Sequence, residues 1–209
     1  MTLPRLLIAG VLVLAGVLYF IFTPADKPVE RAASGADSTP GQSIDRDELL
    51  ALRTGDMRKL AIHTTPKSVP TLTITDSDGA ETNLQAFKGR YVLLNFWATW
   101  CAPCRKEMPS LDALQAELGG DDFQVVLIAT GRNPAPAIAS FFDEVNITNL
   151  KTYLDPQQAL SAEMAVFGLP ATMILDPQGN EIARMRGDAD WHSKDAIVFL
   201  SAMISGDIP

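Results

Sequence analysis

The sequence predicts an α/β fold in which a mixed β-sheet is flanked by helices. Two continuous apolar runs, 91–96 (YVLLNF) and 123–130 (FQVVLIAT), are typical of strands buried in the middle of a sheet. A segment with helical spacing of apolar residues follows each run, and a hairpin and a last helix complete the pattern. This alternation predicts a single sandwich domain, and we find no internal repeat.

Composition and charge narrow the class of protein. Of the 209 residues, 47% are apolar and 20% are charged, which is typical of a globular protein. The formal net charge of -8 argues against nucleic acid and against anionic lipid headgroups as partners.

Residues 6–22 (LLIAGVLVLAGVLYFIF) contain no charged or strongly polar side chain. As a helix this run spans roughly 25 Å, near the lower limit for a bilayer core. A cleaved signal peptide is the alternative, but the run ends in aromatic residues suited to a membrane interface rather than in a small-x-small site. Arg5 precedes the run and balanced charges follow it, so we expect a signal anchor with residues 1–5 in the cytoplasm.

The next two segments connect this anchor to the domain. Residues 23–43 are rich in Pro, Ala, Ser and Gly, which predicts a flexible linker. Residues 44–66 are expected to form an N-terminal helical arm, although Gly55 interrupts the helical spacing. The domain proper is then expected over 67–209.

Short extended segments are expected at 71–76 (TLTITD) and 82–87 (TNLQAF), on either side of a turn at 76–81 (DSDGAE). The acidic turn resembles a calcium loop, but the further oxygen ligands of an EF-hand are out of register. A plain turn is therefore the better interpretation.

The remaining elements follow the two buried strands. Residues 104–118 are expected to be helical, with Met108 among the residues of the apolar face, a kink at Pro109 and a stop at Gly119-Gly120. The pattern then predicts helices at 134–145, 155–168 and 191–205, and a hairpin formed by 170–176 and 181–187.

Both cysteines of the chain, Cys101 and Cys104, lie directly after the first buried strand. A disulfide between them closes too short a loop to stabilise the fold much. Haem attachment requires His where the chain has Arg105, and zinc would need four ligands although only His63 and His192 remain, far apart. Electron exchange by the dithiol is the remaining chemistry.

The position of the pair supports that chemistry. Cys101 would stand at a helix N-terminus, where free backbone N–H groups and the helix dipole lower the pKa of a thiol. Cys104, one turn deeper, can resolve a mixed disulfide by attacking Cys101. Ala102 and Pro103 between them add no cation, which favours a reductant over a strong oxidant.

Three further residues near the pair are candidates for function. Glu107 follows Cys104 by three residues, so it is a candidate proton acceptor for the Cys104 thiol; a solvated acid supporting the helix dipole is the alternative. Trp97 and Trp100 flank the site, and the sequence does not decide which is buried and which forms a contact surface.

The segment 96–109 (FWATWCAPCRKEMP) resembles the active-site segment of membrane-anchored thioredoxin-like proteins of the TlpA type, and the similarity extends over roughly 68–205. The resemblance implies a thioredoxin-like fold. It also implies that Pro170, within 167–187 (FGLPATMILDPQGNEIARMRG), is a cis-proline facing the dithiol and that the backbone of Leu169 pairs with substrate.

The resemblance also bears on the proton acceptor and on substrate contacts. Thioredoxin has a buried Asp where this chain has Asn95, and TlpA-like proteins share the neutral residue and carry a Glu at the position of Glu107. That match favours Glu107 as the proton-transfer residue. The expected substrate-binding residues are Trp100, Ala102, Pro103, Leu169 and Pro170.

The family implies a thiol-disulfide oxidoreductase with its catalytic domain in the periplasm, anchored by a single pass in the bacterial inner membrane. It would reduce client disulfides, in apocytochrome c or copper-handling proteins of oxidase assembly, and be recharged by a membrane electron donor. No cofactor beyond the Cys101–Cys104 pair and no metal is expected.

Two alternatives stay open. The reduced dithiol could carry Cu(I) to an oxidase subunit, which would favour a nearby His or Met ligand. Met108 is the nearest candidate, but its helical spacing directs it to the core. The same dithiol could also serve an oxidant or isomerase, which differs only in potential and electron source.

Overall fold

A computed structural model describes residues 46–206. Its eight strands form one mixed sheet in the order β1-β8-β7-β4-β5-β6-β2-β3. The central strands are β4 (Tyr91–Trp97), β5 (Phe123–Thr130) and β7 (Ala171–Leu175). The others are β1 (Ala61–Ser68), β2 (Ile74–Thr75), β3 (Glu81–Thr82), β6 (Thr152–Asp155) and β8 (Asn180–Arg186). Strands β4, β5 and β6 run parallel, and the remaining neighbours pair antiparallel.

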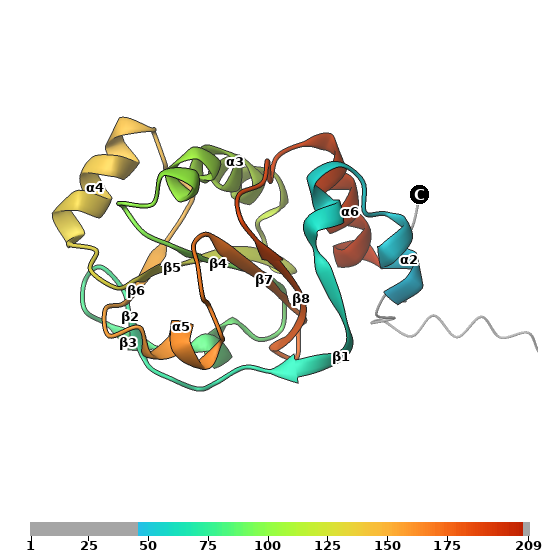
Figure 1. Cartoon of the computed structure of the whole chain (residues 1–209), viewed down its shortest axis with the longest axis horizontal. Helices are drawn as coiled ribbons and strands as arrows, with labels where there is room; N and C mark the ends of the chain where they lie inside the picture. The colour runs from blue at the N-terminus through green and yellow to red at the C-terminus, as the bar shows by residue number, and fades with distance from the viewer. Residues whose placement is uncertain (1–45, 207–209) are drawn as a thin grey trace, which may run out of the picture. The chain divides into compact units, whose positions relative to one another are not determined.

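Helices cover both faces of the sheet (Figure 1). The face that carries the site is covered by α3 (Ala102–Leu118), α4 (Ala135–Glu144) and α6 (Lys194–Ser205), together with α2 (Arg46–Ala51) and the 3₁₀ helix η1 (Gly55–Lys59). The short helix α5 (Ala159–Glu163) and the 3₁₀ helix η2 (Leu84–Phe87) pack on the opposite face. The α/β architecture expected from the sequence is therefore confirmed.

Strand β4 shows how this arrangement positions the site. Successive strand residues point to opposite faces, and Leu93 and Trp97 belong to the core beneath α3 whereas Leu94 and Phe96 belong to the other core. Asn95 has the parity of Leu93 and Trp97, so its amide points toward α3 and is completely buried there. Strand β4 thus places one polar side chain, between the apolar Leu93 and Trp97, on the face that packs against α3.

Several local expectations differ from the structure. Most of 82–87 is not extended, because Asn83 accepts a hydrogen bond from the Gln85 N–H and starts the helical turn η2. The helix expected at 155–168 is only five residues long, because Asp155 ends strand β6, which the sequence pattern did not reveal. The last helix begins at Lys194 rather than at 191, with the Ser193 hydroxyl as its N-cap.

The N-terminal arm is less helical than expected. Helix α2 ends at Ala51, and η1 begins at Gly55, which adopts a left-handed conformation with φ +50°. A Cβ at this position would meet the carboxyl of Asp195. The helical part ends at Lys59, and residues 61–68 form the edge strand β1. The first strand of the sheet therefore begins inside the segment 44–66 assigned to the arm.

The expected signal anchor (6–22) and linker (23–43) lie outside the described residues. Within 46–206 no helix is long and apolar enough to cross a membrane.

Candidate active site

Helix α3 begins directly at the cysteine pair. Cys101 is its N-cap, and the Cys104 N–H donates to the Cys101 sulfur over 3.3 Å. Pro103 fits in the first turn, where its missing N–H costs no hydrogen bond. The two cysteines form a disulfide with an S–S distance of 2.02 Å. The site therefore couples a redox-active bond to the N–H groups of a helix N-terminus.

The two cysteines differ in exposure. Cys101 is 6% exposed, whereas Cys104 is completely buried. Ala102 and Pro103, which stand between them, are exposed. Of the two sulfurs, only that of Cys101 is open to a partner molecule, whereas Cys104 can react with its neighbour Cys101.

Glu107 lies one helical turn beyond Cys104 and is 2% exposed. Its carboxyl accepts hydrogen bonds from Asn95 Nδ2 (2.8 Å), the Ala189 N–H (3.1 Å) and Trp191 Nε1 (3.1 Å). Burial raises the pKa of Glu107 to about 7, because the three hydrogen bonds that favour the carboxylate only partly offset the loss of solvation. The alternative of a solvated helix-dipole acid is therefore excluded by its burial.

Asn95 connects Glu107 to strand β7. Its Nδ2 also donates to the Thr172 hydroxyl over 2.9 Å, since Asn95 and Thr172 are paired residues of β4 and β7. Its Oδ1 is buried and has no hydrogen-bond partner within the described structure. The neutral amide thus serves as a donor toward the carboxyl where thioredoxin has an acid.

The loop before β7 leads into a strand that pairs with β4, the strand that precedes the cysteines. The Leu169–Pro170 bond is cis, the geometry that the family resemblance implies. Leu169 is half-buried and Pro170 buried, whereas Phe167 in the same loop is 86% exposed. Trp100 is 67% exposed and Trp97 is buried, so Trp100 is the tryptophan available as a contact surface.

A hollow of about 340 Å³ adjoins this loop, and its lining includes Phe167, Leu169 and Arg186. A second hollow of about 630 Å³ shares Arg184 and Arg186 with the first and continues toward β1. Together they provide a concave path beside the cis-proline loop.

The two histidines lie apart from the cysteines. His63 Nε2 is 2.7 Å from a Glu181 carboxyl oxygen, and His192 Nε2 is 2.7 Å from Glu117. Within the described residues no group of three or more His, Cys, Asp or Glu side chains is placed to hold a metal ion. Met108 is fully buried in the core, as its helical spacing predicts.

The sequence did not indicate the groups that surround Glu107. Ala189 contributes only a backbone N–H, and Trp191 lies some 80 residues downstream of Glu107 in the sequence. Ser110 adds a link, because its hydroxyl donates to the Glu107 carbonyl and accepts from the Trp191 N–H. One of these contacts had a possible signal in the sequence: a buried tryptophan such as Trp191 needs an acceptor for its indole N–H.

Comparison with known proteins agrees with this geometry. The Redoxin family matches residues 65–198, well over half of the chain. This chain belongs to the Redoxin family. With its Cys101–Cys104 disulfide at a helix N-terminus, it is a thiol-disulfide oxidoreductase.

Two curated relatives show the sequence similarity. The chain is 35% identical to the thioredoxin-like protein YneN of Bacillus subtilis over 115 residues, which cover 54% of this chain and 66% of YneN. It is 28% identical to the thiol-disulfide oxidoreductase ResA of Bacillus thuringiensis over 122 residues, covering 58% and 69% of the two chains. The similarity thus spans about two thirds of each relative.

Solved structures show the same fold. A protein described as a thiol:disulfide interchange protein DsbE, from Chlorobium tepidum, matches with a TM-score of 0.59 at 22% identity, over 69% of this chain and 99% of that one. The exposed lipoprotein thioredoxin Etrx1 of Streptococcus pneumoniae matches with a TM-score of 0.52 at 26% identity, over 63% and 96%. The expected thioredoxin-like fold is confirmed.

Proposed function

We propose that this protein reduces disulfides in client proteins, with Cys101 as the nucleophile, Cys104 as the resolving thiol and Glu107 as the proton acceptor for Cys104. The observation that carries the proposal is the buried Glu107 carboxyl, with a pKa of about 7, one helical turn beyond the fully buried Cys104. An acceptor with a pKa near the working pH is best suited to proton transfer.

In the first step the Cys101 thiolate attacks one sulfur of the client disulfide. A Cys101–client disulfide forms, and the other client sulfur leaves as a thiolate that takes a proton from solvent. In the second step Glu107 takes the Cys104 proton, and the Cys104 thiolate attacks the Cys101 sulfur. The client's second sulfur leaves, so the client gains two electrons and the enzyme becomes the Cys101–Cys104 disulfide.

Recharging reverses this sequence with a dithiol electron donor in the membrane. The donor thiolate attacks the Cys101 sulfur, which is 6% exposed whereas Cys104 is fully buried, and Cys104 leaves as a thiolate. The donor's second thiolate then attacks the donor sulfur of the Cys101–donor disulfide, so Cys101 leaves as a thiolate and the donor becomes a disulfide. Protonated Glu107 then returns its proton to the Cys104 thiolate. A group that is half-protonated near pH 7 serves in both directions.

The client is expected to contact Trp100, Ala102, Pro103, Leu169 and Pro170. The exposed faces of Trp100 and Phe167 supply apolar area, and the Leu169 backbone is available to pair with an extended client segment. We propose that the clients are apocytochrome c or copper-handling proteins of oxidase assembly, in the periplasm.

Localisation in the inner membrane rests on the apolar run 6–22 and its flanks. The relation to a pneumococcal exposed lipoprotein thioredoxin supports a site of action outside the cytoplasm. Membrane fractionation should recover the full-length chain in the membrane, and a soluble product that starts after Phe22 would show a cleaved signal instead.

A resolving-thiol variant tests the function. Cys104→Ser, expressed in the native host, should leave clients disulfide-linked to Cys101, because the second step cannot occur. Mass spectrometry of the trapped complexes identifies the clients. The double variant Cys101→Ser/Cys104→Ser is the control, and a Cys104→Ser protein that traps no more than this control would contradict client reduction.

A further inference from the structure

The segment between β8 and α6 supplies two of the three hydrogen bonds to the Glu107 carboxyl. The Ala189 N–H and the Trp191 indole both donate to Oε2, each over 3.1 Å. Neither donor lies in a helix or strand, since β8 ends at Arg186 and α6 begins at Lys194. Their placement therefore depends on what holds this segment.

One side of the segment is held by α3. The Trp191 N–H donates to the Ser110 hydroxyl over 3.1 Å, and Ser110 is in turn bonded to the Glu107 carbonyl over 2.7 Å. On the same side Lys106 forms an exposed ion pair with the Asp188 carboxyl.

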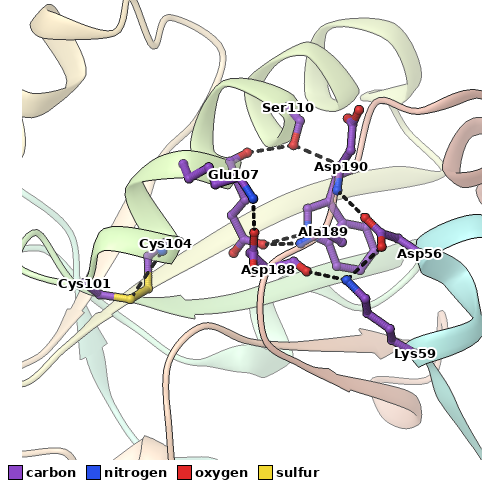
Figure 2. Close-up of polar contacts among 11 residues, drawn as sticks. Asp56, Lys59, Cys101, Cys104, Glu107, Ser110, Asp188, Ala189 and Asp190 are labelled. Atoms are coloured by element: carbon purple, nitrogen blue, oxygen red, sulfur yellow. Dashed lines mark hydrogen bonds and ion pairs between the residues drawn. A yellow bond between two sulfur atoms is a disulfide. The ribbon is translucent and has the colours of Figure 1, made fainter.

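The other side is held by η1 of the N-terminal arm (Figure 2). Lys59 Nζ donates to the Asp188 carbonyl over 3.1 Å, and the Asp190 N–H donates to an Asp56 carboxyl oxygen over 3.1 Å. These two contacts fall on the residues immediately before and after Ala189. Asp56 and Lys59 are joined to each other by a 2.7 Å ion pair, so they form one clamp across the Ala189 N–H.

The clamp has a fixed base. Met57 in η1 and Leu60 directly after it are fully buried in the main core, and the Thr54 hydroxyl donates to Asp195 of α6 over 2.6 Å. An exposed ion pair alone contributes little to stability. This pair differs because both of its members also bind backbone groups of the segment that contacts Glu107.

We propose that Asp56 and Lys59 of the N-terminal arm are positioning residues for Glu107, holding the Ala189 N–H and the Trp191 indole against its carboxyl. This inference deepens the proposed function and rests on the role given there to Glu107. The arm then takes part in the chemistry although it touches neither the dithiol nor the client.

The sign of the effect follows from the groups around Glu107. The Ala189 and Trp191 hydrogen bonds lower its pKa, whereas the Asp188 charge raises it. The charged groups nearby are Asp188 and Asp190 in the segment, Asp56 and Lys59 in η1, and Lys106 on α3; β4 and β7 contribute the neutral Asn95 and Thr172. Releasing the segment weakens both hydrogen bonds to the carboxylate, so the Glu107 pKa should rise from its value of about 7.

Two substitutions of opposite charge test the clamp in the full chain. Lys59→Met removes a cation and Asp56→Ala removes an anion. A direct effect of these charges would move the Glu107 pKa upward for Lys59→Met and downward for Asp56→Ala. Loss of positioning moves it upward in both, and we expect each shift to be about half a pH unit, which corresponds to roughly threefold in the protonation equilibrium.

The readout is the Trp191 indole N–H resonance followed against pH in the disulfide form, because that N–H donates directly to Glu107. Lys59→Arg, which keeps a cationic donor, should retain the wild-type midpoint. Lys67→Met is the matched control, since Lys67 is an exposed lysine on β1 outside the clamp. Upward shifts in Lys59→Met and Asp56→Ala, with neither control shifted, support the inference.

Unchanged midpoints, or shifts in opposite directions, overturn it. The titration does not depend on whether Glu107 transfers protons, so it separates this inference from the proposed function. Suppose that Glu107→Gln resolves mixed disulfides at the wild-type rate while both clamp variants shift the Trp191 midpoint. The proposed proton transfer by Glu107 is then wrong, and the positioning role of Asp56 and Lys59 is supported.

Discussion

Opposing effects hold the pKa of Glu107 near neutral pH. Burial disfavours the carboxylate, and three hydrogen-bond donors favour it, with the result that its pKa is about 7 rather than the ordinary 4.5. Asn95 is decisive here, because an amide donates to the carboxyl without adding a second negative charge. A second acid at that position would have to share a proton with Glu107.

Replacing Glu107 by Gln should slow the release of clients rather than the first attack. Without an acceptor beside Cys104, decay of the Cys101–client disulfide at pH 7 is expected to fall by about 10²-fold. In the wild type the decay rate should rise with pH through about 7, as Glu107 loses its proton, and the variant should lack this step. Rapid-mixing measurements of mixed-disulfide decay from pH 5 to 9 give both results.

Glu117→Gln is the matched control, since Glu117 is a half-exposed acid on the same helix, paired with His192. It should leave the decay rate unchanged. A Glu107→Gln variant that decays at the wild-type rate would remove Glu107 from the reaction.

Much of the site could be predicted from local spacing. Cys101, Cys104 and Glu107 fall within seven residues of one helix, so their order along the chain indicates their relative positions. The partners of Glu107 could not be predicted in this way, because Asn95, Ala189 and Trp191 come from three separate parts of the chain and meet only in the folded structure. The exposure of Trp100 and burial of Trp97 likewise depend on tertiary packing.

The start of α3 accounts for the different roles that we propose for the two thiols. Its free N–H groups stabilise a thiolate at the N-cap position of Cys101, and the same helix places Cys104 under the first turn, away from solvent. The chain passes from strand β4 into the N-terminus of α3. This connection allows a stabilised thiolate at Cys101 and a buried thiol at Cys104, three residues apart.

The reduced protein should therefore be alkylated unequally. Iodoacetamide at pH 7 is expected to modify Cys101 at least ten times faster than Cys104, because the Cys101 sulfur is more accessible and lies at the N-cap of α3. Peptide mass spectrometry of timed samples measures each site. Comparable rates at the two cysteines would contradict the assignment of nucleophile and resolving thiol.

Among the helices and strands, the long and buried ones were the easiest to predict from the sequence. Strands β4 and β5 and helix α3 were predicted because their apolar patterns are continuous. The short elements were not, since β6 has four residues and η2 one turn. The Asn83 side chain accepts from the Gln85 N–H at the start of η2, and the Asp155 carboxyl accepts from the Leu160 and Ser161 N–H groups at the start of α5. The arm is not one continuous helix, because α2 ends at Ala51 and η1 begins at Gly55, whose backbone is left-handed.

Two exposed aromatic side chains mark the surface that we propose contacts clients. Among the described residues the exposed large hydrophobic side chains are Trp100, Phe167 and Val198, and the first two flank the dithiol and the cis-proline loop. Exposed aromatic side chains are unusual on a chain with a net charge of -8, and they support the docking surface that we propose.

Phe167→Ser should weaken reduction of protein clients without affecting the chemistry. Losing the apolar contact of one aromatic side chain is expected to lower kcat/KM for a protein disulfide by about tenfold. Reduction of hydroxyethyl disulfide, which is too small to reach Phe167, should be unchanged. Val198→Ser on α6 is the control, and an equal loss for both disulfides would place Phe167 in the chemistry instead of in docking.

The buried Glu107 carboxyl also makes the free energy of unfolding depend on pH. The Glu107 pKa is about 7 in the folded protein and near 4.5 when unfolded, so between these values the folded state binds more protons. Stability attributable to this group is therefore fully present below pH 4.5 and is lost as the pH rises through 7. Over the whole range the loss amounts to about 3 kcal/mol in the free energy of unfolding.

Urea unfolding of the disulfide form at pH 4.5 and pH 8.5 tests this consequence. Glu107→Gln has no titrating group here, so the difference in stability between wild type and variant should change by about 3 kcal/mol in favour of the variant as the pH rises. Comparing the two pH values cancels any pH-independent effect of the Gln side chain, whose NH₂ must face one of the three donors that now bind Glu107. If the difference were the same at both pH values, Glu107 would titrate near 4.5 in the folded protein. It would then be too weak a base to remove the Cys104 proton efficiently at neutral pH.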